Sequence, residues 1–314
     1  MDKRGISGWL VLLIVLGGAA GCSGRTRPAM DPPFPRQALI AELQEFQQAL
    51  GIERTRNFQR FSGERQAVYR CYFTGKLELP ASYEDLRLIE SDTAGCAVDE
   101  ETYDVFFYPI EAVATRESPV SPALAEAPLE RVLVVVPHED FHEQPETKQT
   151  SPDIAEAAAT LVGFLAATDF ARTKYGETSP IFEQLNREAE LFRDKSGIVN
   201  AYYDRLAGVY AAVESGDLGR EEALFRKEAL FARLERACAS PAAPPVSFNS
   251  CPAAMNNAGL AFDRTYTRYY PIWFDVYASL GRDTAARVAA LKRLLATGLR
   301  SEAELRDRAD ALRP

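Results

Sequence analysis

Histidine is scarce in this 314-residue chain, which contains only two. The chain also lacks a block of lysine and arginine, and its formal net charge is -9. Because binding to phosphates needs a basic surface, we expect no nucleic-acid partner. The apolar run at residues 9–16 is far shorter than the roughly 20 residues of a membrane-spanning helix. A hydrophobic content of 46% is ordinary for a globular protein with a sizeable core.

The N-terminus has the features of a secretory signal in their usual order. Lys3 and Arg4 form a basic start, the apolar run follows, and small residues precede Cys22. The segment Ala19-Ala20-Gly21-Cys22 resembles the lipobox of bacterial lipoproteins, in which the cysteine is lipidated and becomes the mature N-terminus. The pattern therefore predicts lipidation of Cys22.

This resemblance implies three parts of the chain. They are a lipoprotein signal peptide at residues 1–21, a proline-rich tether at residues 22–36 and a folded domain at residues 37–314. Ser23 stands where an inner-membrane retention signal typically has aspartate. We therefore expect a lipid-anchored protein of the bacterial cell envelope, in the outer membrane and facing the periplasm.

The cysteines fit an oxidising compartment. Lipidation of Cys22 leaves four of the five cysteines, an even number. The simplest disulfide pairing is Cys71–Cys96 and Cys238–Cys251, although three connectivities can be drawn and buried free thiols are the alternative.

The spacing of apolar residues predicts an α+β fold that is predominantly helical. Residues 39–50 have the period of a helix, whereas residues 68–73 and 103–108 are rich in aromatic and β-branched residues, as strands are. Residues 132–136 form an apolar run that fits a strand or a helix equally well. We expect a small sheet in the N-terminal half and a helical C-terminal half.

The second half contains clear signals of helix boundaries. Ser151-Pro152-Asp153 predicts a helix start, and Ser301-Glu302-Ala303-Glu304 is a capping box. Helix breaks are expected near three glycines and in the stretch 241–252; the glycines are Gly176, Gly197 and Gly216.

Both histidines of the chain lie in one motif, His138-Glu139-Asp140-Phe141-His142. On a helix, positions i and i+4 share a face, so both imidazoles can reach one metal ion at about 2.0–2.1 Å. Zinc lowers the pKa of its bound water, and Glu139 is near enough to accept the proton. The alternative is a pair of surface histidines on an acidic helix.

A catalytic zinc needs a third protein ligand. With no histidine left, the HExxHxxGxxH arrangement is excluded, and the ligand must be a carboxylate or a cysteine. Glu156 is the better candidate because it opens the next predicted helix, whose small residues allow close packing on the metal helix. Asp153 is the second candidate. Alternatively, Glu156 only complements the helix dipole.

These residues resemble a known family. The histidine motif followed by residues 155–163 is similar to the gluzincin layout and, more narrowly, to the bacterial putative aminopeptidase family of lipoprotein-like zincins. A second block, Met255-Asn256-Asn257-Ala258-Gly259-Leu260-Ala261 with Thr265-Tyr266 after it, is similar to the Asn-Asn-Ala-x-Leu segment and tyrosine of that family. The resemblance covers roughly residues 130–297.

The resemblance implies a zincin-like domain and a role for each motif residue. Zn²⁺ would be held by His138, His142 and Glu156, with Glu139 as general base. Tyr266 would donate a hydrogen bond to the oxyanion, although it also belongs to an aromatic helical stripe of the kind usually found in cores. The resemblance also implies that two asparagines shape the substrate pocket, Asn256 and Asn257.

Two residues depart from the pattern of the family. Asp140-Phe141 replaces a small or aliphatic pair, and the added charge of Asp140 would strengthen cation binding. Pro137 directly precedes His138, so we expect the metal helix to start or to kink there.

The first functional hypothesis is therefore a zinc metallopeptidase, a putative aminopeptidase, acting on peptides in the cell envelope. The second is a non-catalytic envelope lipoprotein that binds a peptide or a protein partner on a degenerate zincin scaffold. The third is a helical structural lipoprotein without metal.

Overall fold

The computed structural model describes residues 36–62, 69–91, 95–110, 112, 117–239 and 254–312. The expected signal peptide, nearly all of the expected tether and Cys22 lie outside these residues. Cys251 does as well, so lipidation and the Cys238–Cys251 disulfide stay predictions.

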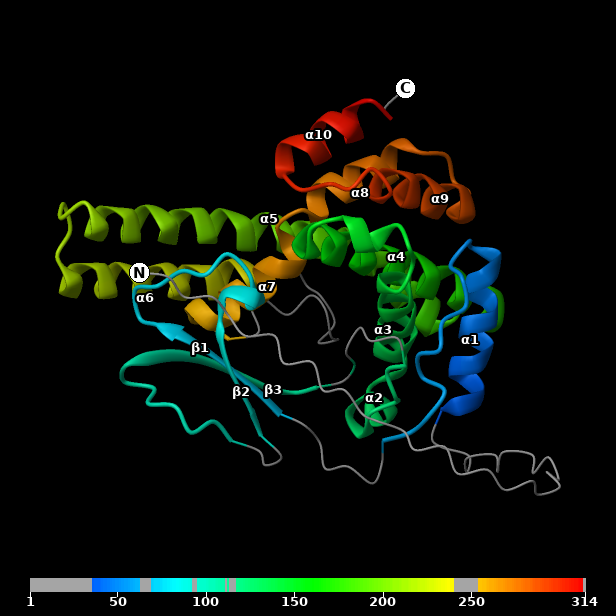
Figure 1. The fold of residues 1–314 in the computed structure, drawn as a ribbon, viewed down its shortest axis with the longest axis horizontal. Coiled ribbons are helices and arrows are strands. Elements are labelled where there is room, and N and C mark those ends of the chain that lie inside the picture. Colours follow the sequence, from blue (N-terminus) through cyan, green and yellow to red (C-terminus); the bar gives the residue numbers. More distant parts are fainter. Residues whose placement is uncertain are drawn as a thin grey trace, which may run out of the picture. The chain divides into compact units, whose positions relative to one another are not determined.

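The fold is mainly helical, with one small antiparallel sheet in the N-terminal half, which confirms the expected α+β class (Figure 1). The elements of the described residues are α1 (Gln37–Ala49), β1 (Tyr69–Gly75), η1 (Tyr83–Asp85), β2 (Arg87–Ser91), β3 (Tyr103–Pro109), α2 (Pro122–Glu126), α3 (Leu129–His142), η2 (Thr147–Gln149), α4 (Pro152–Tyr175), α5 (Pro180–Glu214), α6 (Arg220–Cys238), α7 (Asn257–Thr267), α8 (Tyr270–Ser279), α9 (Thr284–Leu295) and α10 (Glu302–Asp310).

Helix α4 lies at the centre of the core. It packs against α3, α5, α7, α8 and α9, and it is apolar on all sides, as a helix surrounded by others must be. By length and composition alone α4 could cross a membrane, but 83% of its most apolar 18-residue stretch is buried inside the fold. Figure 1 shows α3 beside α4, and α1 packs against α3 and also contacts α4.

The sheet has the strand order β2-β1-β3, and α7 covers one of its faces. Tyr72 and Phe106 of the sheet pack against Ala258 and Ala261 of α7. On β1, Cys71 pairs with Cys96 at disulfide distance, with their Cα atoms 5.6 Å apart, as expected from the sequence. Strand β2 was not predicted, since its residues are mostly exposed and carry no apolar alternation.

Residues 132–136, which the sequence left undecided, are helical. Helix α3 starts at Leu129 and runs through Pro137 without ending, so the expectation of a start at the proline was wrong. Every residue from Val132 to Val136 is buried, because the run faces α1 on one side and α4 on the other. Pro137 has no N–H, so it cannot donate the usual helical hydrogen bond to the carbonyl of Leu133.

Most predicted boundaries of the second half are confirmed. Ser151 precedes α4, and the hydroxyl of Ser301 accepts from the backbone N–H of Glu304 at the start of α10. Gly176 and Gly216 follow the ends of α4 and α5 with φ of 87° and 80°. The break expected at Gly197 was wrong: α5 continues through it, because a glycine in a helix interior costs only about 1 kcal/mol.

Candidate metal centre

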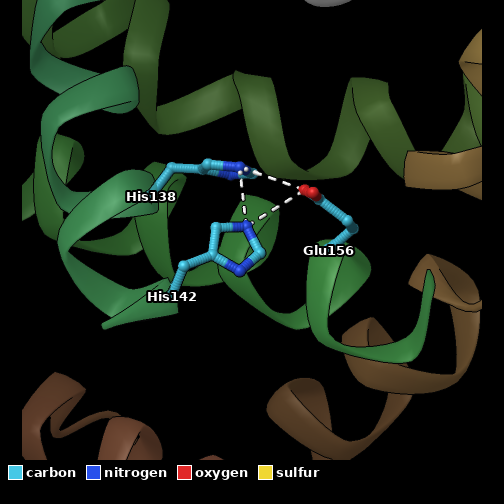
Figure 2. Close-up of side chains that lie close together, drawn as sticks. All are labelled: His138, His142 and Glu156. Atoms are coloured by element: carbon cyan, nitrogen blue, oxygen red, sulfur yellow. Dashed lines mark hydrogen bonds and ion pairs between the residues drawn. The ribbon is translucent and has the colours of Figure 1, made fainter. Parts of the chain in front are cut away.

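Helices α3 and α4 bring three side chains to one point (Figure 2). The Nε2 atoms of His138 and His142 lie 3.1 Å apart. Oε2 of Glu156 lies 3.2 Å from the first of them and 3.1 Å from the second. The two histidines therefore share one face of α3, and the first turn of α4 supplies the carboxylate, as the spacing predicted.

The arrangement fits a zinc ion by its spacing and by its chemistry. Tetrahedral ligands at about 2.0–2.1 Å from zinc are separated from one another by roughly 3.4 Å, close to the distances found here. Only one hydrogen can lie between the two facing Nε2 atoms, whereas a cation can accept a lone pair from each imidazole and from the carboxylate. The side chains are between 12 and 14% exposed, so the cluster is nearly buried and still reachable from solvent.

The electrostatics of the cluster are those of a tightly coupled group. Burial acts to raise the pKa of Glu156, but the interactions with His142 and His138 outweigh it and hold this pKa well below its ordinary value. Burial acts in the opposite direction on His142, and the negative charges of Glu156 and Glu139 raise its pKa above the usual range. The Glu156 carboxylate therefore stays ionised over a wide pH range, and its negative charge is what raises the pKa of His142.

Glu139 lies on the same turn of α3, next to His138. Burial raises the pKa of its carboxyl, and the nearby charges of His138 and His142 oppose that effect only in part. Among the described residues, no side chain or backbone group is found hydrogen-bonded to this carboxylate. Its oxygens remain available to a water molecule or a substrate.

Tyr266 of α7 also reaches the cluster. Its ring centroid lies 6.2 Å from that of His138. Burial, followed by the charge of Glu156, raises the pKa of the Tyr266 hydroxyl well above its ordinary value, so this group keeps its proton. The other residues of the aromatic stripe pack in or against the main core; they are Tyr269 or Tyr270, Trp273 and Tyr277.

Asn256, expected to shape the substrate pocket, makes hydrogen bonds at the start of α7. Its Oδ1 caps α7 by accepting from the backbone N–H of Gly259 at 3.0 Å. Its Nδ2 donates to the carbonyl of Val105 on β3 at 2.8 Å. The side chain therefore ties the start of α7 to the sheet.

Asn257, given the same expected role, is fully buried. Its Nδ2 donates to the carbonyls of Lys76 and Glu78 at 3.1 and 2.9 Å, and its Oδ1 accepts from the Tyr210 hydroxyl at 2.9 Å. A contact with substrate would break these bonds. Both asparagines thus hold α7 against its neighbours, and their expected role in shaping a substrate pocket stays a prediction.

Two acidic residues of the sequence analysis lie away from the cluster. Asp153, the second candidate ligand, faces Arg268, with 3.4 Å between the charged groups. Asp140 turns toward the N-terminal segment rather than toward the two histidines. The four side chains that donate hydrogen bonds to its carboxylate are Gln44, Gln47, Thr55 and Asn57.

The sequence analysis missed Tyr83. Its hydroxyl donates to Oε1 of Glu156 at 3.1 Å, the carboxylate oxygen not directed at the histidines. Burial, with the charge of Glu156 next, raises the pKa of Tyr83 far above the ordinary value for tyrosine. No sequence signal pointed to this contact, because it joins residues 73 positions apart in elements with no shared motif.

The fold and the cluster together define a mainly helical α+β protein with a centre of two histidines and one glutamate on adjoining helices. Residues 91–305 match the family model described as "Putative aminopeptidase", and the chain belongs to that family. Comparison with curated proteins and with solved structures found no match. The matched segment includes the three cluster residues and Tyr266, whereas Tyr83 precedes it.

Proposed function

We propose that this chain is a zinc-dependent peptidase of the gluzincin type, anchored by lipid in the bacterial cell envelope. The observation that carries the proposal is the convergence of two imidazole nitrogens and one carboxylate oxygen within 3.1–3.2 Å of one another. The family description, which names a peptidase, agrees with that chemistry.

His138, His142 and Glu156 would hold the ion. When bound, zinc would activate water and polarise the carbonyl of the scissile peptide bond. Three protein ligands leave a fourth position open, which distinguishes catalytic from structural zinc sites.

Glu139 would act as the general base. It follows His138 directly, its carboxylate is near both imidazoles, and it has no competing partner among the described residues. It would take a proton from the attacking water and pass it to the leaving amine. Tyr266 would donate a hydrogen bond from its hydroxyl to the oxygen that becomes negative as the carbonyl is attacked.

The envelope location rests on the N-terminal sequence. A basic start, a short apolar run and the Ala-Ala-Gly-Cys segment support export and lipidation of Cys22. The Cys71–Cys96 pair at disulfide distance agrees with an oxidising compartment. Peptides that reach the periplasmic side of the outer membrane would be the substrates.

The deciding experiment is Glu139→Gln in the full chain, with Glu143→Gln as the matched control. Glu143 is a nearby glutamate at the end of α3 that pairs with Lys148. Zinc content is measured by elemental analysis and hydrolysis with fluorogenic aminoacyl amides and short peptides. We expect about one zinc in both variants, and a rate loss of about 10²–10⁴-fold in Glu139→Gln alone. Zinc binding with an unchanged rate would reject the mechanism, and wild-type protein without zinc would reject the site.

A further inference from the structure

The two carboxylate oxygens of Glu156 have different partners. Oε2 faces the Nε2 atoms of both histidines, at 3.1 and 3.2 Å. Oε1 accepts a hydrogen bond from the hydroxyl of Tyr83, at 3.1 Å. The Tyr83 bond therefore fixes the rotation of the carboxylate, which decides how its oxygens are presented to a cation.

Tyr83 is itself held in place by its backbone. Its N–H donates to Oγ1 of Thr265, a buried residue of α7, at 2.9 Å. The preceding residue, Ser82, caps the short helix η1 by accepting from the N–H of Glu84. The start of η1 is thus fixed against α7.

The ring of Tyr83 is packed on several sides. Its centroid lies 6.0 Å from that of Phe262 and 6.3 Å from that of Tyr266 on α7. Tyr72 of β1 lies 6.2 Å away. With backbone and ring both fixed, little freedom remains in the direction of the hydroxyl.

From this geometry we propose that Tyr83 is a positioning residue of the metal centre, holding Glu156 so that one oxygen is directed at the cation position. The proposal rests on the zinc site proposed above. It is not a catalytic role, because the Tyr83 hydroxyl is engaged with the ligand rather than with the reacting atoms. Outer partners of this kind orient metal ligands, and their loss typically costs 10–100-fold in metal affinity.

The proposal extends the site beyond the segment that matches the family. Tyr83 lies before residue 91, where the match begins. The segment β1–η1–β2 would therefore be a functional part of the centre, in addition to packing against α7.

The test compares Tyr83→Phe with Tyr72→Phe in the full chain. Both changes remove one hydroxyl and keep the ring in the same aromatic cluster, but the Tyr72 hydroxyl is near Arg70 rather than Glu156. Zinc affinity is measured by chelator competition, and the site is also loaded with Co²⁺ to record its visible absorption bands. Melting of the metal-free proteins identifies a temperature at which both variants are folded.

We expect Tyr83→Phe to bind zinc about 10–100-fold more weakly and to shift the Co²⁺ bands, while Tyr72→Phe matches wild type. A purely structural role for Tyr83 would leave the Co²⁺ bands unmoved. If wild type binds zinc and Tyr83→Phe binds it equally well with the same spectrum, this inference is overturned and the proposed function stands. If wild type binds no zinc, both fail together.

Discussion

Gly163 of α4 lies directly against the backbone of Val134 of α3. A β-carbon on Gly163 would come within 2.8 Å of the Val134 carbonyl oxygen and 3.3 Å of the His138 β-carbon. Only glycine allows this approach of the two helices. Because Val134 lies one turn before His138, the contact sets the separation between the histidines and Glu156.

Gly163→Ala should therefore damage both stability and the metal site. The added methyl group forces α3 and α4 apart, at a cost of about 1–3 kcal/mol in the free energy of unfolding, and zinc affinity should fall with it. Urea unfolding and chelator competition measure the two effects.

Gly197→Ala on α5 is the control for this prediction. A β-carbon there meets nothing within 4 Å, and the position is inside a helix. We expect the free energy of unfolding to increase by roughly 0.5–1 kcal/mol. Equal effects of the two alanines would contradict the role given to Gly163.

If the proposed zinc site exists, Glu156→Gln should abolish zinc binding. The change keeps the shape of the side chain but replaces the anionic ligand. Loss of a residue that only orients a ligand costs up to roughly 100-fold in metal affinity, so loss of the ligand itself should cost more. Asp153→Asn, on the same turn of α4 but paired with Arg268, should bind zinc like wild type. Elemental analysis after dialysis distinguishes them, and the opposite pattern would make Asp153 the ligand.

Asp140→Asn should destabilise the fold. The four groups around this buried carboxylate are all donors, and an amide would direct its own N–H groups at some of them. Leaving buried donors unpaired costs about 1–3 kcal/mol. Glu222→Gln makes the same chemical change in an exposed pair with Arg226 and should alter unfolding by less than about 1 kcal/mol. A neutral result for Asp140→Asn would show that these contacts add no stability.

Tyr269 should make stability fall at alkaline pH. Burial, with the charge of Asp153 next, raises its pKa from 10.0 to about 12. Between these values the unfolded chain has lost the phenol proton while the native protein keeps it, so rising pH favours unfolding. Relative to the Tyr269→Phe variant, the free energy of unfolding of wild type should fall by about 1 kcal/mol between pH 9 and pH 11. Urea unfolding at both pH values measures this, and parallel behaviour of the two proteins would contradict it.

Local signals predicted the parts of the fold that depend on neighbouring residues. The helix starts at Ser151 and Ser301 could be predicted because a cap needs only residues within one turn. The histidine pair and Glu156 were found for a similar reason, since i, i+4 spacing fixes a helix face and the small side chains of α4 indicated close packing.

Contacts between distant segments could not be predicted from signals of neighbouring residues. Tyr83 meets Glu156 only because η1 packs on α7, and Asn257 is buried only because α5 and the loop after β1 enclose it. Residues 132–136 were ambiguous because a run buried on all sides shows neither the period of a helix nor that of a strand.

The proline inside α3 has a mechanical consequence. Since Pro137 cannot donate to the carbonyl of Leu133, α3 lacks one backbone hydrogen bond immediately before the turn that bears both imidazoles. With that bond absent, the direction of the following turn depends on packing against other parts of the chain. Helix α4 supplies such packing, since a β-carbon on Gly163 would come within 3.3 Å of the His138 β-carbon. The same helix thus contributes Glu156 to the cluster and the surface against which both histidines are held.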